Sequence, residues 1–104
     1  MAVQHPKYRV AAVQAAPAFL DLDASVDKAV RLIAEAAKGG AKLVAFPETW
    51  IPGYPWFIWL DSPAWGMQFI QRYHDNSLIY GTPPADRLAK AAKDHQIMVV
   101  MGHS

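Results

Sequence analysis

Apolar residues form three short, near-continuous runs in this chain, at residues 8–16, 42–46 and 97–102. The runs are rich in Val, Ile and Ala and show no strict alternation with polar residues. This pattern is typical of strands that a parallel sheet buries on both faces. Pro17 and Pro47 directly follow the first two runs and help to end them, because proline has no backbone N–H to donate.

Between the first two runs, apolar residues recur every three or four positions, which predicts an amphipathic helix. The apolar stripe consists of Val26, Ala29, Val30, Ile33 and Ala37. The candidate N-cap residues are Asp21, Asp23 and Ser25. Gly39 and Gly40 end the helix, as glycine commonly does. A strand, a helix and a strand within about 40 residues form a βαβ unit, which should be parallel and right-handed.

The second half of the chain predicts a loop, two helices and the third strand. Residues 49–63 are rich in Pro and Trp and predict the loop. A helix is expected over residues 64–80, with one face made of Trp65, Phe69, Tyr73 and Tyr80. Thr82 and the two prolines after it predict the start of the next helix, which runs to about residue 95. Its inward positions are Leu88, Ala91 and Ala92.

Composition and charge exclude several classes of protein. The 104 residues suit one small domain, and the 53% that are hydrophobic suffice for a core and exclude a disordered chain. The net charge is +1 with both signs interspersed, so we expect no nucleic-acid or membrane partner. The longest apolar stretch contains prolines and is shorter than the ~20 residues of a membrane span. Because the N-terminus also lacks a signal-peptide pattern, we expect a cytoplasmic protein.

The chain has no cysteine and four histidines. The lack of cysteine excludes disulfides, thiolate metal sites and a cysteine nucleophile within these 104 residues. The histidines do not have the spacing of metal ligands. Two ion pairs are expected on helix surfaces at i,i+4 spacing: Asp27 with Arg31, and Asp86 with Lys90.

Glu48 is the strongest candidate for chemistry. It follows the second predicted strand, and ligands of open α/β sheets bind beyond the carboxyl ends of the strands. We expect its apolar neighbours to shield it from water; they are Phe46, Pro47, Trp50 and Ile51. A poorly solvated carboxyl group has a raised pKa, which suits a general base or acid near neutral pH. The alternative is a carboxylate that only caps a loop or a helix.

The segment around Glu48 resembles the glutamate motif of the carbon–nitrogen hydrolases. The motif residues are Phe46-Pro47-Glu48 and Pro52-Gly53-Tyr54-Pro55. The resemblance extends over essentially the whole chain, from the strand at residues 10–15, through Lys28, to the closing residues 99–104. Within that superfamily, residues 49–56 are most similar to bacterial nitrilases, including those that act on arylacetonitriles.

The resemblance implies an α/β fold, the four-layer α-β-β-α sandwich of the nitrilase superfamily. Residues 1–104 would be the N-terminal part of one such domain, truncated at its C-terminal side: a βαβ unit, two helices and a third strand. The family's catalytic residues are a glutamate, a lysine and a cysteine, and Glu48 matches the glutamate, which acts as general base. The lysine and the cysteine are expected beyond the third strand, so we expect the 104-residue chain alone to be inactive.

The resemblance also implies a reaction, a set of partners and an assembly. The cysteine thiolate attacks the nitrile carbon to form a covalent thioimidate, and water then releases ammonia and the carboxylic acid. The substrates are a small-molecule nitrile and water, and the family uses no metal or organic cofactor. Family members are homo-oligomers, in which dimers build larger spirals.

Aromatic residues follow Glu48 closely and are candidates for the wall of a substrate pocket. We assign this role to Tyr54, Trp50 and Trp56. The alternative for each is ordinary packing in the core or at an interface, which we favour for Phe57 and Trp59.

Two other functions remain open at this stage. The first is an amidase or a cyanide-hydrolysing enzyme of the same superfamily, which would use the same glutamate. The second is an inactive fragment with only a structural or interaction role. The second alternative would leave the apolar loop at residues 49–63 exposed, and such a patch promotes association.

Overall fold

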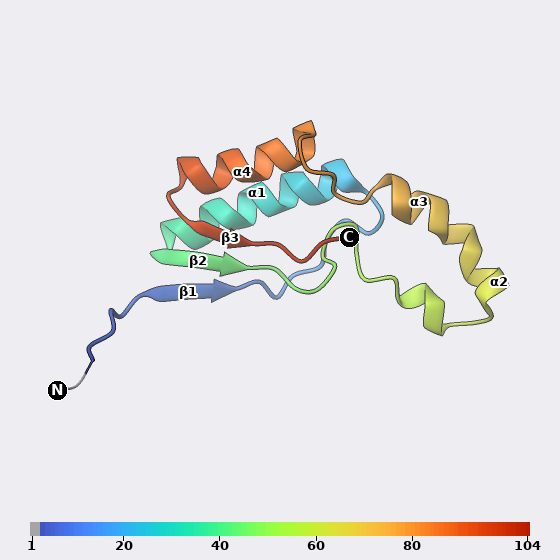
Figure 1. The fold of residues 1–104 in the computed structure, drawn as a ribbon, viewed down its shortest axis with the longest axis horizontal. Coiled ribbons are helices and arrows are strands. Elements are labelled where there is room, and N and C mark those ends of the chain that lie inside the picture. Colours follow the sequence, from blue (N-terminus) through green and yellow to red (C-terminus); the bar gives the residue numbers. More distant parts are fainter. Residues whose placement is uncertain (1–2) are drawn as a thin grey trace.

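The computed structural model describes residues 3–104, which form one parallel sheet covered by helices on one face. The strands are β1 (Arg9–Ala12), β2 (Ala41–Ala45) and β3 (Met98–Val100), in the order β1-β2-β3. Helices α1 (Leu22–Lys38) and α4 (Pro83–Asp94) lie side by side on the same face of this sheet (Figure 1). The predicted βαβ unit and the α/β arrangement of an N-terminal portion of the nitrilase fold are therefore confirmed.

Helix α1 begins and ends at the residues that its sequence favours. Of the three candidate caps, Asp21 is the N-cap, and its carboxylate accepts a hydrogen bond from the backbone N–H of Ala24 at 3.0 Å. Ser25 is fully buried, and its hydroxyl donates to the carbonyl of Ala18 at 2.8 Å. Gly39 closes the helix by donating its N–H to the carbonyl of Glu35 at 3.0 Å. Both ends of α1 are thus satisfied by local residues.

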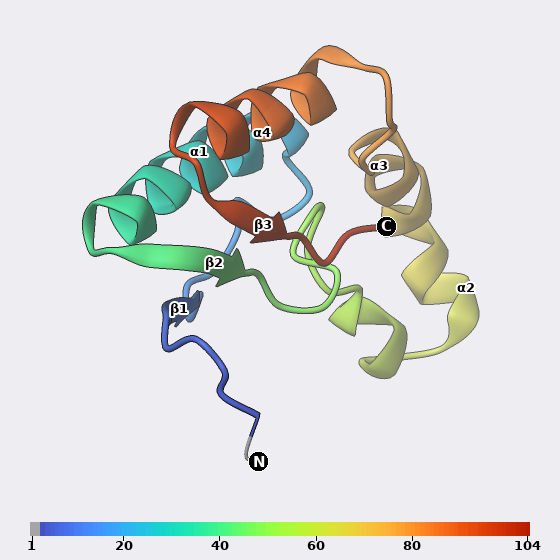
Figure 2. The same cartoon turned by 60° about the vertical axis from the view of Figure 1, so that its left-hand side comes forward.

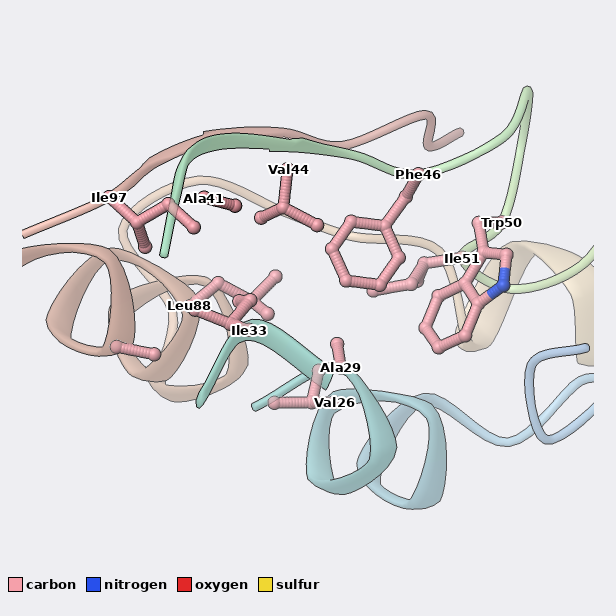
Figure 3. Close-up of a cluster of buried hydrophobic side chains, with 11 residues drawn as sticks. Val26, Ala29, Ile33, Ala41, Val44, Phe46, Trp50, Ile51, Leu88 and Ile97 are labelled. Atoms are coloured by element: carbon pink, nitrogen blue, oxygen red, sulfur yellow. The ribbon is translucent and has the colours of Figure 1, made fainter. Parts of the chain in front are cut away.

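The core lies between the sheet and the two long helices (Figure 3). It joins α1, β2, α4 and the segment after β2, and its members are Val26, Ala29, Ile33, Ala41, Val44, Phe46, Trp50, Ile51, Leu88, Ala91 and Ile97. Of the residues that were predicted to face inward, Val26, Ala29 and Ile33 are fully buried. Because Phe46, Trp50 and Ile51 belong to this cluster, the same core that binds the helices to the sheet also holds the segment around Glu48.

The other face of the sheet carries apolar side chains that no helix of residues 3–104 covers (Figure 1). Val10, Met98 and Val100 are about half exposed or more. Register pairs Val10 with Leu43 and Leu43 with Met98, so these side chains form one continuous row across the strands. The apolar strands that predicted burial on both faces are therefore buried on one face within the described residues.

The single helix predicted over residues 64–80 is wrong. The chain instead forms α2 (Pro63–Gly66), η2 (Met67–Phe69) and α3 (Ile70–Asp75), and η1 (Trp56–Trp59) precedes them within the predicted loop. These elements lie beyond the carboxyl ends of the strands (Figure 2). Two polar side chains bond to the last carbonyls of α3, where the helix ends. The amide of Asn76 donates to the carbonyl of Arg72, and the hydroxyl of Ser77 donates to the carbonyl of Tyr73. Tyr80 therefore lies outside any helix.

The aromatic face that was assigned to that helix is formed in part. The ring of Phe57 packs on that of Phe69 with centroids 4.9 Å apart, and on that of Tyr73 at 6.3 Å. Trp65 meets Phe69 edge-on at 5.3 Å. Tyr80 instead packs against His103, with the ring centroids 5.4 Å apart. Phe57 is buried, in agreement with its predicted packing role.

Charged residues pair differently from the i,i+4 prediction. Asp27 accepts from Arg87 at 2.6 Å, which links α1 to α4, and Lys90 pairs with Asp94 at 2.5 Å. The neighbouring helix brings a guanidinium to Asp27, so the pair with Arg31 does not form. The hydrogen bond from Lys90 lowers the pKa of Asp94 below its ordinary value. No helix among residues 3–104 is long and apolar enough to cross a membrane.

The core predicts a large difference between two substitutions on α1. Ile33→Ala removes a fully buried side chain, so we expect the free energy of unfolding to fall by about 2–5 kcal/mol. Asp27→Asn weakens only the exposed pair with Arg87, so its cost should stay below about 1 kcal/mol. Chemical unfolding followed by circular dichroism measures both values. Equal costs for the two variants would contradict the core described above.

Candidate functional site

Glu48 lies on a tight turn directly after β2, at the carboxyl end of the sheet. The turn comprises residues 47–50 and is called the Glu48 turn below. The backbone N–H of Trp50 donates to the carbonyl of Pro47 at 3.2 Å and closes it. Thr49 has φ of 52°, a left-handed conformation that is a genuine outlier for a β-branched residue. Such a conformation persists only where the surrounding structure imposes it.

On one side, the Glu48 turn is held by the segment that continues β3. The N–H of Phe46 donates to the carbonyl of Val100 at 2.8 Å. The N–H of Ile51 donates to that of Gly102 at 3.3 Å, and the N–H of Ser104 donates to that of Ile51 at 2.9 Å. These bonds extend the β2–β3 pairing past the ends of both strands, with the Glu48 turn between them.

Gly102 makes the closest approach to this turn. A β-carbon built on Gly102 would lie 1.9 Å from the carbonyl oxygen of Pro47 and 2.9 Å from the α-carbon of Glu48. Only glycine allows the two backbones to come so close. The sequence alone did not single out Gly102, because a glycine at the end of an apolar run also fits an ordinary strand terminus.

On the other side, the Glu48 turn is held by the segment that continues β1. The indole N–H of Trp50 donates to the carbonyl of Ala15 at 2.8 Å, and the ring packs on that of Phe46 with centroids 4.9 Å apart. Further along, the N–H of Leu20 donates to the carbonyl of Pro52 at 2.9 Å. The turn is therefore fixed to both neighbouring segments of the sheet.

The expected shielding of Glu48 by its apolar neighbours is wrong for residues 3–104. Glu48 is exposed, whereas Phe46, Trp50 and Ile51 are buried. These three side chains enter the core beside α1 (Figure 3), and Glu48 is not a member of that core. Within the described residues the carboxylate of Glu48 forms no ion pair. The site therefore presents an accessible carboxylate on a turn whose backbone is fixed by hydrogen bonds.

The three aromatic residues predicted to line a substrate pocket are not brought together. Tyr54 and Trp56 are both about half exposed, whereas Trp50 is only 2% exposed and belongs to the core. Trp56 stacks on Phe19 with ring centroids 5.6 Å apart, and the hydroxyl of Tyr54 accepts from the indole of Trp59 at 3.3 Å. Tyr54 and Trp56 can line an apolar surface, while the indole of Trp50 has no face open to a ligand within the described residues.

Phe19 is a residue of this surface that the sequence patterns did not reveal. Its ring packs against Gly53, where a β-carbon would lie 2.5 Å from the ring and where φ is 126°. Phe19 lies between the first strand and the first helix and belongs to no periodic pattern. A bulky apolar residue just before an N-cap was the only available signal.

Within residues 3–104, the Glu48 turn presents a carboxylate without a thiol or a metal centre beside it. Residues 3–104 contain no group of three or more His, Asp or Glu side chains that could hold a metal ion. The sequence has no cysteine, so these 104 residues supply no thiol. What the described residues can do chemically is to accept a proton at the exposed carboxylate of Glu48.

Comparison with known proteins gives consistent matches over nearly the whole chain. The family model described as carbon-nitrogen hydrolase matches residues 9–104. A nitrilase of Pseudomonas syringae pv. syringae (strain B728a) is 58% identical over 96 residues, which cover 92% of this chain and 29% of that protein. An aliphatic nitrilase of Rhodococcus rhodochrous is 56% identical over 98 residues, covering 93% of this chain and 27% of that protein.

A third relative carries a different name. A cyanide hydratase of Botryotinia fuckeliana (strain T4) is 43% identical over 104 residues, which cover all of this chain and 28% of that protein. The chain thus spans between a quarter and a third of the length of these relatives.

The close contact at Gly102 predicts that a single methyl group disturbs the Glu48 turn. Gly102→Ala places its β-carbon against the Pro47 carbonyl, so we expect the free energy of unfolding to fall by about 1–3 kcal/mol or more. Gly39→Ala is the matched control, since its β-carbon would meet nothing closer than 3.5 Å and should change stability by less than about 0.5 kcal/mol. Chemical unfolding measures both, and a tolerated Gly102→Ala would exclude the contact.

Proposed function

Because the chain belongs to the carbon–nitrogen hydrolase family, we propose that it is the part of a nitrilase that carries the general base, Glu48. The observation that carries this proposal is the position of Glu48, on a turn fixed at the carboxyl end of β2 between the continuations of β1 and β3. The relatives named nitrilase, at up to 58% identity, support the choice of nitriles as substrates.

In the proposed reaction, an organic nitrile and two water molecules give a carboxylic acid and ammonia. Glu48 takes the proton of a cysteine thiol as the sulfur attacks the nitrile carbon and delivers it to the nitrile nitrogen, which gives a covalent thioimidate. Glu48 then takes a proton from water as the water attacks the thioimidate carbon. Both protons of this water pass to the nitrogen, so that ammonia leaves and a thioester to the cysteine remains. A second water releases the acid and restores the thiol. The cysteine, and a lysine that stabilises the developing charge, lie outside these 104 residues.

The rigidity of the Glu48 turn supports this role. A base contributes most when it is held in place before the reaction, because the thiol then meets it in the reactive geometry. Glu48 is accessible in the described residues, so a nucleophile supplied by another segment can reach it. That segment and the bound nitrile would also exclude water from Glu48, which suits a general base.

Tyr54 and Trp56 are proposed to line the pocket for the side chain of the nitrile. Both are half exposed and belong to the loop that follows the Glu48 turn. An aromatic lining favours a nitrile with an aromatic or bulky side chain over cyanide itself. In the complete enzyme we propose a homo-oligomer in which dimers build larger spirals, as implied by the family.

A second candidate is a cyanide hydratase, which would add one water to cyanide and release formamide. Relatives of that name in Botryotinia fuckeliana and Armillaria gallica, 43% and 42% identical to this chain, favour it as the alternative. Glu48 would act as base in the same first step, so the turn does not discriminate between the two reactions.

Replacing Glu48 tests the proposed base. The assay uses a chimera in which this chain replaces the matched segment of the Pseudomonas syringae nitrilase. Glu48→Gln keeps the size of the side chain and removes the proton acceptor, so kcat for ammonia release should fall by about 10²–10⁴-fold. KM should change little.

Glu35→Gln is the matched control, because Glu35 is the only other glutamate of the chain and is exposed on α1. It should keep kcat within about twofold, as expected for a surface substitution. Near-normal turnover by Glu48→Gln would remove Glu48 from its role. An assembled chimera that releases no ammonia with the native residues would count against a nitrilase.

The product distinguishes the two candidate reactions. With an arylacetonitrile, the same chimera should release ammonia and the acid in equal amounts, because both waters are added. With cyanide, we expect turnover to be at least about tenfold lower, since cyanide cannot use the contacts of an aromatic lining. Faster turnover of cyanide, with formamide and no ammonia as products, would favour the hydratase.

A further inference from the structure

We propose that Trp50 is a positioning residue for Glu48, which it holds in place through the hydrogen bond from its indole to the carbonyl of Ala15. The proposal rests on the role of Glu48 as the base, proposed above. It assigns Trp50 a function different from the pocket wall that the sequence predicted.

Trp50 makes two hydrogen bonds that restrain the turn on which Glu48 lies. Its backbone N–H closes the Glu48 turn on the carbonyl of Pro47 at 3.2 Å. Its side chain anchors the same residue to the segment after β1, through the 2.8 Å bond to Ala15. A movement of the indole therefore displaces the end of a four-residue turn on which Glu48 is the second residue.

The surroundings of the indole give this bond its importance. Trp50 is 2% exposed, and its ring lies at one end of the core beside Phe46 and Ile51 (Figure 3). A buried indole N–H needs an acceptor, because water cannot replace a lost partner there. The ring alone would be satisfied by any apolar contact, whereas the N–H requires Ala15 at one defined position. The bond thus sets the position of the indole within the core.

Thr49 indicates that the turn needs such a restraint. Its φ of 52° is unfavourable for a β-branched residue, so the turn relaxes when a restraint is lost. The restraints lie on opposite sides: Gly102 packs against Pro47 and Glu48 from the β3 side, and Trp50 is anchored from the β1 side. With the anchor of Trp50 removed, Thr49 can return to an ordinary conformation, and Glu48 moves with it.

The test compares Trp50→Phe with the native chimera defined above. Phenylalanine keeps an aromatic ring beside Phe46 and removes the N–H donor together with part of the indole ring. We expect kcat to fall roughly tenfold while KM stays within about twofold, because a misplaced base affects the chemical step more than substrate binding. Hydrogen exchange measured by mass spectrometry should be faster, by roughly threefold, in the peptide that contains residues 47–52.

Trp59→Phe is the matched control. Trp59 also donates its indole N–H, to the hydroxyl of Tyr54, but it is 74% exposed and is not part of the Glu48 turn. It should alter neither kcat nor the exchange of residues 47–52. Thr49→Gly is a second test that leaves the core intact. Glycine adopts a φ of 52° without strain, so adding Thr49→Gly to Trp50→Phe should restore part of the lost kcat at unchanged KM.

Two outcomes would overturn the positioning role. The first is normal kcat in Trp50→Phe, or a loss of kcat in that variant that the added Thr49→Gly does not reduce. The second is a raised KM that depends on the size of the nitrile, with unchanged exchange, as expected for a pocket wall. Glu48→Gln separates this proposal from the proposed function. If that variant stays active, the base assignment fails, and the exchange data still decide whether Trp50 holds the turn.

Discussion

The backbone pairing between the segments that follow β2 and β3 is the constraint on which the site depends. The hydrogen bonds from Phe46 to Val100, from Ile51 to Gly102 and from Ser104 to Ile51 carry the parallel sheet beyond its regular strands. Without them, the Glu48 turn would be held only by the core and by the bond from Trp50 to Ala15, since Glu48 itself contributes no ion pair within residues 3–104. The bonds also explain the need for glycine at position 102, where two main chains meet with no space for a side chain.

The core and the candidate site share residues, so the stability of the domain and the conformation of the Glu48 turn depend on the same packing. Phe46, Trp50 and Ile51 pack with Val26, Ala29 and Ile33 of α1, and they also flank the Glu48 turn. Burial of these side chains is the main favourable contribution to folding, so the turn is fixed by the same packing that forms the domain. Glu48 lies on the opposite side of the turn and remains accessible.

Much of the fold was predictable from the sequence because its signals are local. Val26, Ala29 and Ile33 recur with helical spacing, Asp21 and Gly39 mark the ends of α1, and the three apolar runs became parallel strands. The helix predicted over residues 64–80 ended early, at Asp75, because the side chains of Asn76 and Ser77 bond to the carbonyls of its last turn. Of the candidate site, Glu48 could be placed at the end of a strand. The exposure of Glu48 and the burial of Trp50 could not be predicted. Both depend on the orientation of the turn, which is set only when the continuations of β1 and β3 pack against it.

The contact of Gly102 with Pro47 and Glu48 also has a consequence for recombining related enzymes in the laboratory. The two sides of this contact are more than fifty positions apart in the chain, yet they fit each other atom to atom. A crossover placed between them would combine a turn from one parent with a β3 continuation from another. Residues 46–51 and 100–104 should therefore be taken from the same parent. A crossover before residue 46 or after residue 104 is better tolerated than one between these two segments.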